Sequence, residues 1–396
     1  MTTAPFYLSA LGLVNALGRG KTPVAQGLFR GDTSGLLLES GWIPGKDARV
    51  GRVLSELAPL PSAFGIDDSR NARLLLAALE EIRNEVEAEL VKHGPSRIGV
   101  VLGTSTSGMD SGEKAMAYHM EHQAFPDAYH YFQQEIGRPA PFLADYLGLR
   151  GPAITVSTAC TSSGRAIATA RNLIRLGICD AVITGGADSL CKLTLNGFKA
   201  LEATSTNLTN PMSRNREGIN IGEGAVLFIL RREEAEVALL GVGETSDAHH
   251  ISAPDPTGLG AENAMRMALA DAGLKPEQIG YLNMHATATP KNDEMESRAI
   301  AGVFPHGVRC SGTKPLTGHT LGAAAATELA FCWLTLQPSW NPGDLLPPHR
   351  WDGVADPELP ALPLVTEGQT LGQARICLSN AFAFGGNNLS LIVGRP

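Results

Sequence analysis

Residues 153–176 read AITVSTACTSSGRAIATARNLIRL, an apolar run joined to an alanine-rich run by a turn that carries Cys160. The pattern predicts a buried strand followed by a helix over 161–176, which Gly177 ends. Residues 309–336, RCSGTKPLTGHTLGAAAATELAFCWLTL, repeat this plan with His319 at the turn. Both helices carry small residues on every face, which is typical of helices buried between sheets. The two stretches therefore predict a layered αβαβα fold made by duplication.

Other short apolar runs predict the rest of this fold. Further strands are expected at 97–104, 181–187, 225–232, 279–286, 374–382 and 388–395, and further helices at 70–92, 261–273 and 292–302. Several of the strands are apolar on both faces, which favours a sheet covered by helices on both sides. We expect two halves, residues 1–240 with Cys160 and residues 241–396 with His319.

The bulk properties exclude several classes of protein. A chain of 396 residues with 43% hydrophobic and 18% charged residues is globular and too long for one ordinary core. The net charge of −8 and the absence of a basic run argue against a nucleic-acid binder. No window reaches the ~18 uninterrupted apolar residues of a membrane span. Residues 1–21 lack the basic start and the cleavage site of a signal peptide, so we expect a cytoplasmic protein.

Of the six cysteines, Cys160 is the one at the start of a predicted helix. The free N–H groups and the positive dipole end of such a helix lower the pKa of a thiol, and they can also hold the oxyanion of a tetrahedral intermediate. A packed core thiol is the alternative at this position. The other five lie within or beside apolar segments without a CxxC pair, which indicates reduced core thiols rather than disulfides or a zinc site.

Two histidines stand at comparable positions. His285 ends an apolar strand and precedes alternating alanines and threonines, and His319 lies in the glycine-rich turn GTKPLTGHTLGAA. Either one alone is consistent with a core histidine that satisfies its own hydrogen bonds. Together with Cys160 and the motif AFAFGGNN at 381–388, they favour a site for thiol-based acyl transfer.

Five motifs are similar to those of one family. They are STACTSS (157–163), GINIGEGA (218–225), HATATPKND (285–293), GTKPLTGHTLGAAAATE (312–328) and LSNAFAFGGNN (378–388). In this order they resemble the β-ketoacyl-acyl carrier protein synthases of the thiolase superfamily, in the condensing branch with a Cys-His-His site. The resemblance covers nearly the whole chain. It implies a duplicated five-layered αβαβα fold, a homodimer, and decarboxylative Claisen condensation of an acyl-enzyme thioester with malonyl-acyl carrier protein in fatty acid, polyene or polyketide elongation.

The resemblance implies a catalytic network of five residues. Cys160 matches the nucleophile that accepts the acyl group. His285 and His319 match the pair that binds the malonyl thioester carbonyl and promotes loss of carbon dioxide. Lys314 matches the lysine beside the second histidine and Glu328 the buried glutamate that anchors the network, although a purely structural ion pair is the alternative for these two. The implied chemistry requires no metal and no organic cofactor.

The resemblance also implies residues that hold the substrate. Phe384 matches the phenylalanine at the mouth of the acyl pocket, and its backbone N–H joins that of Cys160 in an oxyanion hole. Thr287 and Thr289 match threonines that hydrogen-bond the pantetheine arm. The alternative for these two is that they satisfy backbone groups at the end of a strand.

The implied partner is an acyl carrier protein, which presents acyl and malonyl thioesters on phosphopantetheine. Because carrier proteins are acidic and this chain is acidic too, docking requires local positive charge. Arg70 and Arg73 lie where relatives often carry basic residues for this contact, and Lys199 is a further candidate. Glu202 lies where a relative often has arginine, which weakens the case for one docking patch.

The sequence departs from the family pattern at three positions. Ala286 and Ala288 stand where the motif has glycines, so we expect their methyl groups to narrow the pantetheine channel or to change the backbone. Asn387 stands where threonine is usual. These changes favour a specialised branch that makes polyene or aryl-polyene chains.

Three related classes fit less well. Thiolases use a second catalytic cysteine near the C-terminus, whereas Cys377 lies inside the strand before the glycine-rich motif. Synthases that start chains use one histidine and one asparagine, and His319 with the preceding Lys314 argues against this class. Chain-length-factor subunits usually lose the cysteine present here as Cys160, so we expect the active member of a homodimer, or of a heterodimer with such a subunit.

His119 and His122 lack an acidic or cysteine context, which argues against a metal site there.

Overall fold

The computed structural model describes residues 5–395. The start of the segment in which we expect no signal peptide, residues 1–4, lies outside this range. Most of the strands form two sets, and the strands of the two sets are arranged in the same way. The first set is, in order across the sheet, β1 (Phe6–Asn15), β9 (Gly224–Arg231), β7 (Ala181–Asp188), β5 (Ile98–Gly103) and β6 (Ala153–Val156). The second set is β10 (Ala238–Ser246), β14 (Asn387–Gly394), β13 (Ile376–Phe382), β11 (Tyr281–Met284) and β12 (Cys310–Gly312).

The two sets also share their strand directions. In each set the first two pairs are antiparallel and the last two are parallel. β1 also pairs with β10, with Phe6 opposite Leu239, which connects the two sets. The repetition of order and direction confirms the duplicated fold predicted from the sequence. The first set ends at Arg231 and the second begins at Ala238, so the division expected between residues 240 and 241 falls inside β10.

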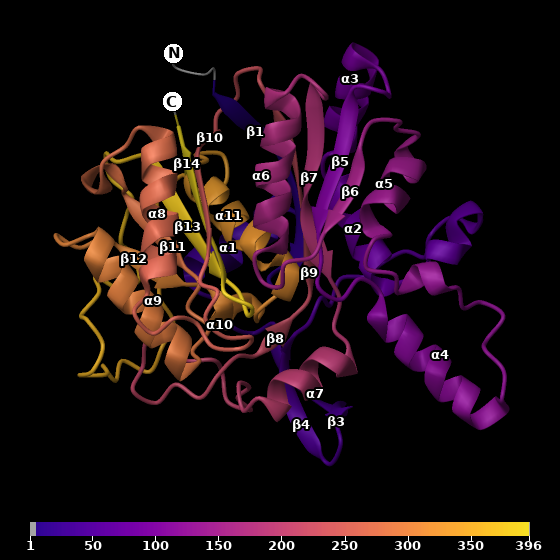
Figure 1. The fold of residues 1–396 in the computed structure, drawn as a ribbon, viewed down its shortest axis with the longest axis horizontal. Coiled ribbons are helices and arrows are strands. Elements are labelled where there is room, and N and C mark those ends of the chain that lie inside the picture. Colours follow the sequence, from indigo (N-terminus) through magenta and orange to yellow (C-terminus); the bar gives the residue numbers. More distant parts are fainter. Residues whose placement is uncertain (1–4, 396) are drawn as a thin grey trace.

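Helices fill three layers around these strands (Figure 1). The central layer holds α1 (Lys21–Arg30), α6 (Ser162–Arg175) and α11 (Ala324–Thr335), which share one hydrophobic core with both sets of strands. One outer layer holds α2 (Arg70–Glu80), α3 (Arg83–His93) and α5 (Pro139–Leu147), and the other holds α8 (Leu259–Ala272) and α9 (Pro290–Val303). Every residue of α11 is buried, as its apolar composition requires. This is the five-layered αβαβα arrangement expected from the resemblance.

Two predicted helices differ from the observed ones. The helix expected over 70–92 is two helices, α2 and α3, because Ile82 leaves the helical conformation (φ −129°) and is fully buried at the turn between them. The alanine-rich helix expected after the turn at His319 starts with a tight turn at Leu321–Ala323 before α11 begins.

Several elements were not predicted from hydrophobic patterns. Helix α4 (Met109–His122) projects from the body as an arm (Figure 1). A small separate sheet contains β3 (Leu36–Ile43), β4 (Lys46–Gly51) and β8 (Ile221–Gly222), and α7 (Lys192–Ala200) packs beside it. Short elements complete the chain at β2 (Gly18–Arg19) and α10 (Lys314–Thr317). Within residues 5–395, no helix combines the length and the apolar character that crossing a bilayer requires.

The end of β5 lies directly against the start of α6. A Cβ atom at Gly103 would lie 2.2 Å from the backbone nitrogen of Ser163. Only glycine permits this approach, because backbone atoms of a buried helix cannot move aside at low cost. The contact fixes the first turn of α6, which follows Cys160.

We expect Gly103→Ala to lower the free energy of unfolding by about 1–3 kcal/mol or more, because the added methyl group overlaps a buried backbone. Chemical denaturation monitored by circular dichroism measures this change. Gly137→Ala is the matched control, since a Cβ atom there meets nothing within 4 Å, and it should change stability by less than about 0.5 kcal/mol. Equal effects of the two variants would contradict the assignment of Gly103 as a packing residue.

Candidate active site

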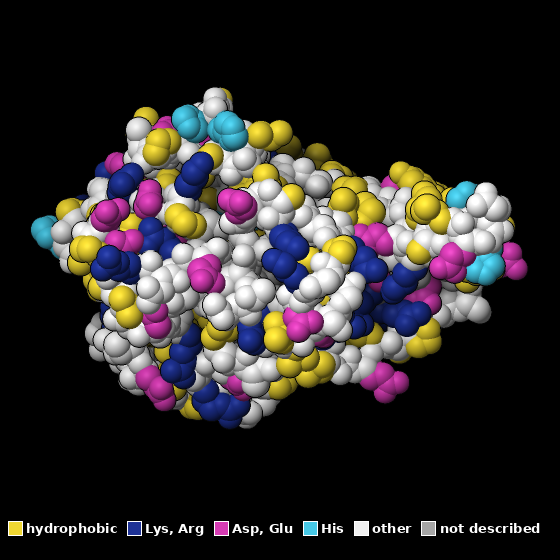
Figure 2. Space-filling view, turned by 90° about the horizontal axis from the view of Figure 1, so that it is seen from below, with side chains coloured by type: hydrophobic (Ala, Val, Ile, Leu, Met, Phe, Trp, Pro, Cys, Tyr) yellow, Lys and Arg dark blue, Asp and Glu magenta, His cyan; other side chains and the backbone are white. Residues whose placement is uncertain are grey.

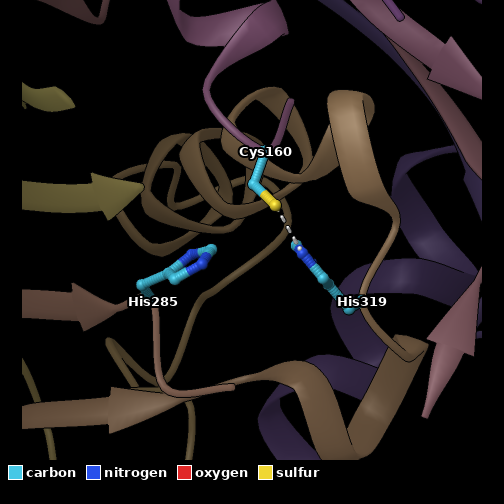
Figure 3. Close-up of side chains that lie close together, drawn as sticks. All are labelled: Cys160, His285 and His319. Carbon is cyan, nitrogen blue, oxygen red and sulfur yellow. Dashed lines mark hydrogen bonds between the residues drawn. The ribbon is translucent and has the colours of Figure 1, made fainter. Parts of the chain in front are cut away.

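Three side chains from three separate turns converge on one cavity (Figure 3). Cys160 precedes α6 and follows Ala159, whose backbone is left-handed (φ 51°), so that the chain makes a sharp bend there. His285 follows β11, and His319 lies between α10 and α11. The Sγ atom of Cys160 lies 2.9 Å from Nε2 of His319, and the two imidazole rings lie 5.3 Å apart. The structure thus brings together the three residues that the sequence singled out.

Burial dominates the acid–base chemistry of Cys160 and His319. Burial raises the pKa of Cys160 to about 12, and the charge of Lys314 and a hydrogen bond from the Phe384 backbone N–H offset only part of this rise. Burial and then the charge of Lys314 hold the pKa of His319 well below 6.5. At neutral pH the pair is therefore a thiol beside a neutral imidazole. Lost hydration shifts the thiol pKa in the direction opposite to the lowering that the helix terminus predicts.

Lys314 connects His285 to Glu328 beneath the cavity. Its buried ammonium donates to the backbone carbonyl of His285 and to Glu328, and lies 3.4 Å from Nδ1 of His285. Because an ammonium only donates, Nδ1 is the acceptor and the proton of the neutral imidazole lies on Nε2. Burial raises the pKa of Glu328 to about 7 despite the opposing charge of Lys314. Although Lys314 is close to His319 in sequence, its ammonium binds the other histidine.

Two buried carboxylates hold the strained backbone after His285. Ala286 and Ala288 have left-handed backbones, with φ of 40° and 61°. Glu296 accepts hydrogen bonds from the backbone nitrogens of His285 (2.7 Å) and Ala286 (2.6 Å), and Asp293 accepts one from that of Ala288 (3.1 Å). The alanines therefore keep a conformation that suits glycine, and the carboxylates offset part of its cost.

Contrary to one of our expectations, the methyl groups of these alanines do not narrow the cavity. Neither alanine lines it, and both are fully buried. A Cβ atom at Gly312 would lie 2.5 Å from the Cβ of Ala286, so that methyl group points toward β12. The absence of a side chain at Gly312 makes room for the one added at position 286.

The cavity has a volume of about 360 Å³ and is mostly lined by apolar groups. The predicted residues Thr287, Thr289 and Phe384 line it, and the two threonine hydroxyls lie 3.0 Å apart. Other lining residues were not predicted as site residues: Phe198, Leu201, Ile219, Asp247, Lys291, Asn292, Phe382 and Asn388. Phe382 could have been found, since it alternates with Phe384 in the motif AFAFGG. Ile219, Lys291, Asn292 and Asn388 also lie in the quoted motifs, whereas Phe198, Leu201 and Asp247 lie outside them.

The predicted docking residues lie outside this cavity. Arg70 forms a two-pronged ion pair with the fully buried carboxylate of Glu223, and Arg73 pairs with Asp68. Both arginines line a separate hollow, and Figure 2 shows Lys and Arg side chains gathered beside the root of the α4 arm. Lys199 lies on α7, next to Phe198. The structure therefore assigns Arg70 a structural partner.

Cys160, His285 and His319 are also the one group of potential metal ligands within residues 5–395, with ligand atoms within 4.8 Å of one another. The nearby ammonium of Lys314 disfavours a cation there. His119 stacks on Phe125 on the α4 arm and is not part of any such group.

Comparison with known proteins identifies the family. The N-terminal domain of β-ketoacyl synthase matches residues 46–235, and the C-terminal domain matches residues 237–345. Nodulation protein E of Rhizobium meliloti is 35% identical over 311 residues, which is 74% of this chain and 75% of that protein. A 3-oxoacyl-[acyl-carrier-protein] synthase 2 of Staphylococcus aureus is 31% identical over 353 residues, or 82% and 83% of the two chains.

Solved structures agree with this result. A ketosynthase from Xenorhabdus doucetiae, solved in complex with its chain length factor, has a TM-score of 0.94 and 48% identity over 99% of this chain and 98% of that one. A β-ketoacyl synthase from Burkholderia phymatum has a TM-score of 0.84 and 26% identity, covering 100% of both chains. The chain belongs to the β-ketoacyl synthase family. It is an acyltransferase-class enzyme, a β-ketoacyl-acyl carrier protein synthase of chain elongation in fatty acid or polyketide biosynthesis.

The neutral state of Cys160 predicts how its reactivity depends on pH. Because its pKa is about 12, the thiolate fraction, and with it the rate of alkylation by iodoacetamide, should rise about tenfold per pH unit between pH 7 and pH 10. Mass spectrometry after timed quenching measures the modification at Cys160, and Cys160→Ser corrects for the other thiols. A plateau near neutral pH would instead indicate a preformed thiolate–imidazolium pair.

The contact between Ala286 and Gly312 predicts an energetic coupling. Gly312→Ala alone should lower the free energy of unfolding by about 1–3 kcal/mol. Ala286→Gly alone should change it by less than about 1 kcal/mol, because relief of the left-handed strain offsets the added chain entropy. The double variant should regain most of the lost stability in a denaturation experiment. Strictly additive effects would show that the two Cβ positions do not compete for space.

Proposed function

We propose that Cys160, His285 and His319 carry out both half-reactions of a decarboxylative condensation. The observation that supports this proposal is the 2.9 Å contact between Sγ and Nε2 of His319, with His285 at the same cavity. In the first half-reaction the S–H proton passes to Nε2 of His319 while the sulfur attacks the acyl thioester carbon. The backbone N–H groups of Cys160 and Phe384 hold the oxyanion. Its collapse expels the carrier thiolate, which takes the proton from His319.

The second half-reaction uses both histidines as donors. Before this step the neutral imidazole of His319 moves its one proton from Nδ1, which has no partner among residues 5–395, to Nε2. The thioester carbonyl of the malonyl group then accepts hydrogen bonds from Nε2 of His285 and of His319 while the carboxylate leaves as carbon dioxide. The enolate that remains is stabilised by these donors, which act most strongly in an apolar cavity. It attacks the acyl carbon on Cys160 and expels the thiolate of Cys160, which takes up one proton from solvent. Lys314 and Glu328 act as positioning residues, since they keep Nδ1 of His285 an acceptor.

A second ketosynthase-like chain is the proposed partner. Strand β6 is the last strand of its set, and Ile154 on it is 38% exposed. An open strand edge with an exposed apolar side chain is suited to pairing with another chain. The X. doucetiae ketosynthase was solved with its chain length factor, which favours such a subunit over a second copy of this chain.

The acyl carrier protein is proposed to dock near the mouth of the cavity. Lys199 is the predicted docking residue closest to the lining residues, because it adjoins Phe198. Thr287 and Thr289 are proposed to bind the pantetheine arm. The docking role of Arg70 and Arg73, the cytoplasmic location and the polyene or aryl-polyene branch stay predictions.

Mass spectrometry of the intact enzyme after incubation with an acylated carrier protein tests this function. We expect a stable acyl adduct on Cys160 that is absent in Cys160→Ala. His285→Ala should still form the adduct but should decarboxylate malonyl carrier protein at least about 100-fold more slowly, because it lacks one enolate donor.

The same experiment also tests the role assigned to each residue. Acylation of the Cys160→Ala variant at another residue would contradict the proposed nucleophile. Loss of the adduct in His285→Ala would show that this histidine acts in acyl transfer rather than in decarboxylation. A Lys314→Met variant should reduce decarboxylation while it leaves acylation largely intact.

A further inference from the structure

Three charged side chains other than histidine line the cavity: Glu202, Asp247 and Lys291. Asp247 is already engaged, because it accepts hydrogen bonds from the side chain of Asn388 (2.6 Å) and the backbone of Asp255 (3.1 Å). Glu202 and Lys291 have no side-chain partner among residues 5–395. The cavity thus has one free anion and one free cation that the condensation itself does not use.

Lys291 lies on the same wall of the cavity as the two threonines. It follows Thr289 and Pro290 in the first turn of α9, and its side chain is exposed. Thr287, Thr289, Lys291 and Asn292 all line the cavity, so the short segment after His285 supplies it with two threonines, an asparagine and a lysine. An exposed cation among these polar residues is suited to an anionic group on the substrate.

Glu202 is held in an unfavourable backbone conformation. It is the residue after the C-terminal cap of α7, and its φ is 55°. Helices usually place glycine or asparagine at this position, because other residues are strained there. A strained, exposed glutamate among the residues that line a cavity indicates a role for its carboxylate.

We propose that Lys291 binds the phosphodiester of the carrier's phosphopantetheine arm, and that Glu202 disfavours substrates with further phosphates, such as coenzyme A thioesters. This inference rests on the proposed function, because it requires that carrier-bound thioesters enter this cavity. One ammonium neutralises one phosphodiester. The extra phosphates of coenzyme A meet no second free cation among the lining residues and are repelled by Glu202 and by a chain of net charge −8.

The first test compares wild-type enzyme with Lys291→Gln on two small acyl thioesters. One is the thioester of phosphopantetheine, whose terminal phosphomonoester stands in for the carrier's phosphodiester, and the other is the thioester of pantetheine, which lacks the phosphate. Mass spectrometry follows the acylation of Cys160. We expect the second-order rate constant for the phosphopantetheine thioester to fall about tenfold, which corresponds to 1.4 kcal/mol. The constant for the pantetheine thioester should not change. Lys46→Gln, an exposed lysine of β4 outside the cavity, is the control and should leave both constants unchanged.

The second test addresses Glu202 with two variants. Glu202→Gln removes the charge and keeps the strain, whereas Glu202→Gly removes both. We expect both to raise the rate of acylation by a coenzyme A thioester about threefold or more, relative to the phosphopantetheine thioester. Agreement between the two variants would assign the effect to the charge rather than to the backbone.

The outcomes distinguish this inference from the function on which it rests. Equal losses on both small thioesters in Lys291→Gln, or no loss on either, would overturn the role of Lys291. An unchanged preference between coenzyme A and phosphopantetheine in both Glu202 variants would overturn the role of Glu202. If the wild-type enzyme acquires no acyl group on Cys160 from any thioester, the proposed function fails, and this inference fails with it.

Discussion

The site depends on the close contact between α6 and α11 in the central layer. A Cβ atom at Gly164 would lie 2.2 Å from the side chain of Leu389 and 3.1 Å from the Cβ of Ala325. The hydroxyl of Ser163 accepts a hydrogen bond from the backbone nitrogen of Ala326 (2.9 Å), so the two helices begin side by side. The turn before each helix therefore faces the same cavity. Larger side chains in this contact would force the helices apart and separate the thiol from its imidazole.

Buried carboxylates support this arrangement by binding backbone rather than substrate. Asp188 accepts hydrogen bonds from the backbone of Ser105 and Thr106 in the first half and of Ala323 in the second. Glu296 accepts hydrogen bonds from the backbone nitrogens of His285 and Ala286. Isolated buried carboxylates are costly, and burial raises the pKa of Glu296 to about 7. The protein thus uses several buried acidic groups to hold strained turns in place, and Ala286 tolerates its left-handed backbone in this setting.

Much of the fold could be predicted because its signals are local. Apolar runs bounded by glycine placed four strands of each half, but not β1 and β10. Small-residue helices predicted α6 and α11 of the central layer, but not α1. The helix expected over 70–92 was wrong in one respect, because the break at Ile82 depends on where that side chain is buried. The α4 arm and the small sheet near it gave no clear apolar period, since few of their residues face a core. Of the site, Cys160, His285 and His319 could be predicted together, because each lies in a short motif.

The sequence by itself determined the duplicated plan, the family and the three reactive side chains, since these depend on short runs of residues. Only the tertiary structure decided their electrostatics and their supporting contacts. Burial raises the pKa of Cys160, although the thiol lies just before a helix. The ammonium of Lys314 binds His285, 29 residues away, and Arg70 pairs with Glu223, 153 residues away. Such contacts join segments that are distant along the chain, and local patterns carry no information about which buried groups will meet.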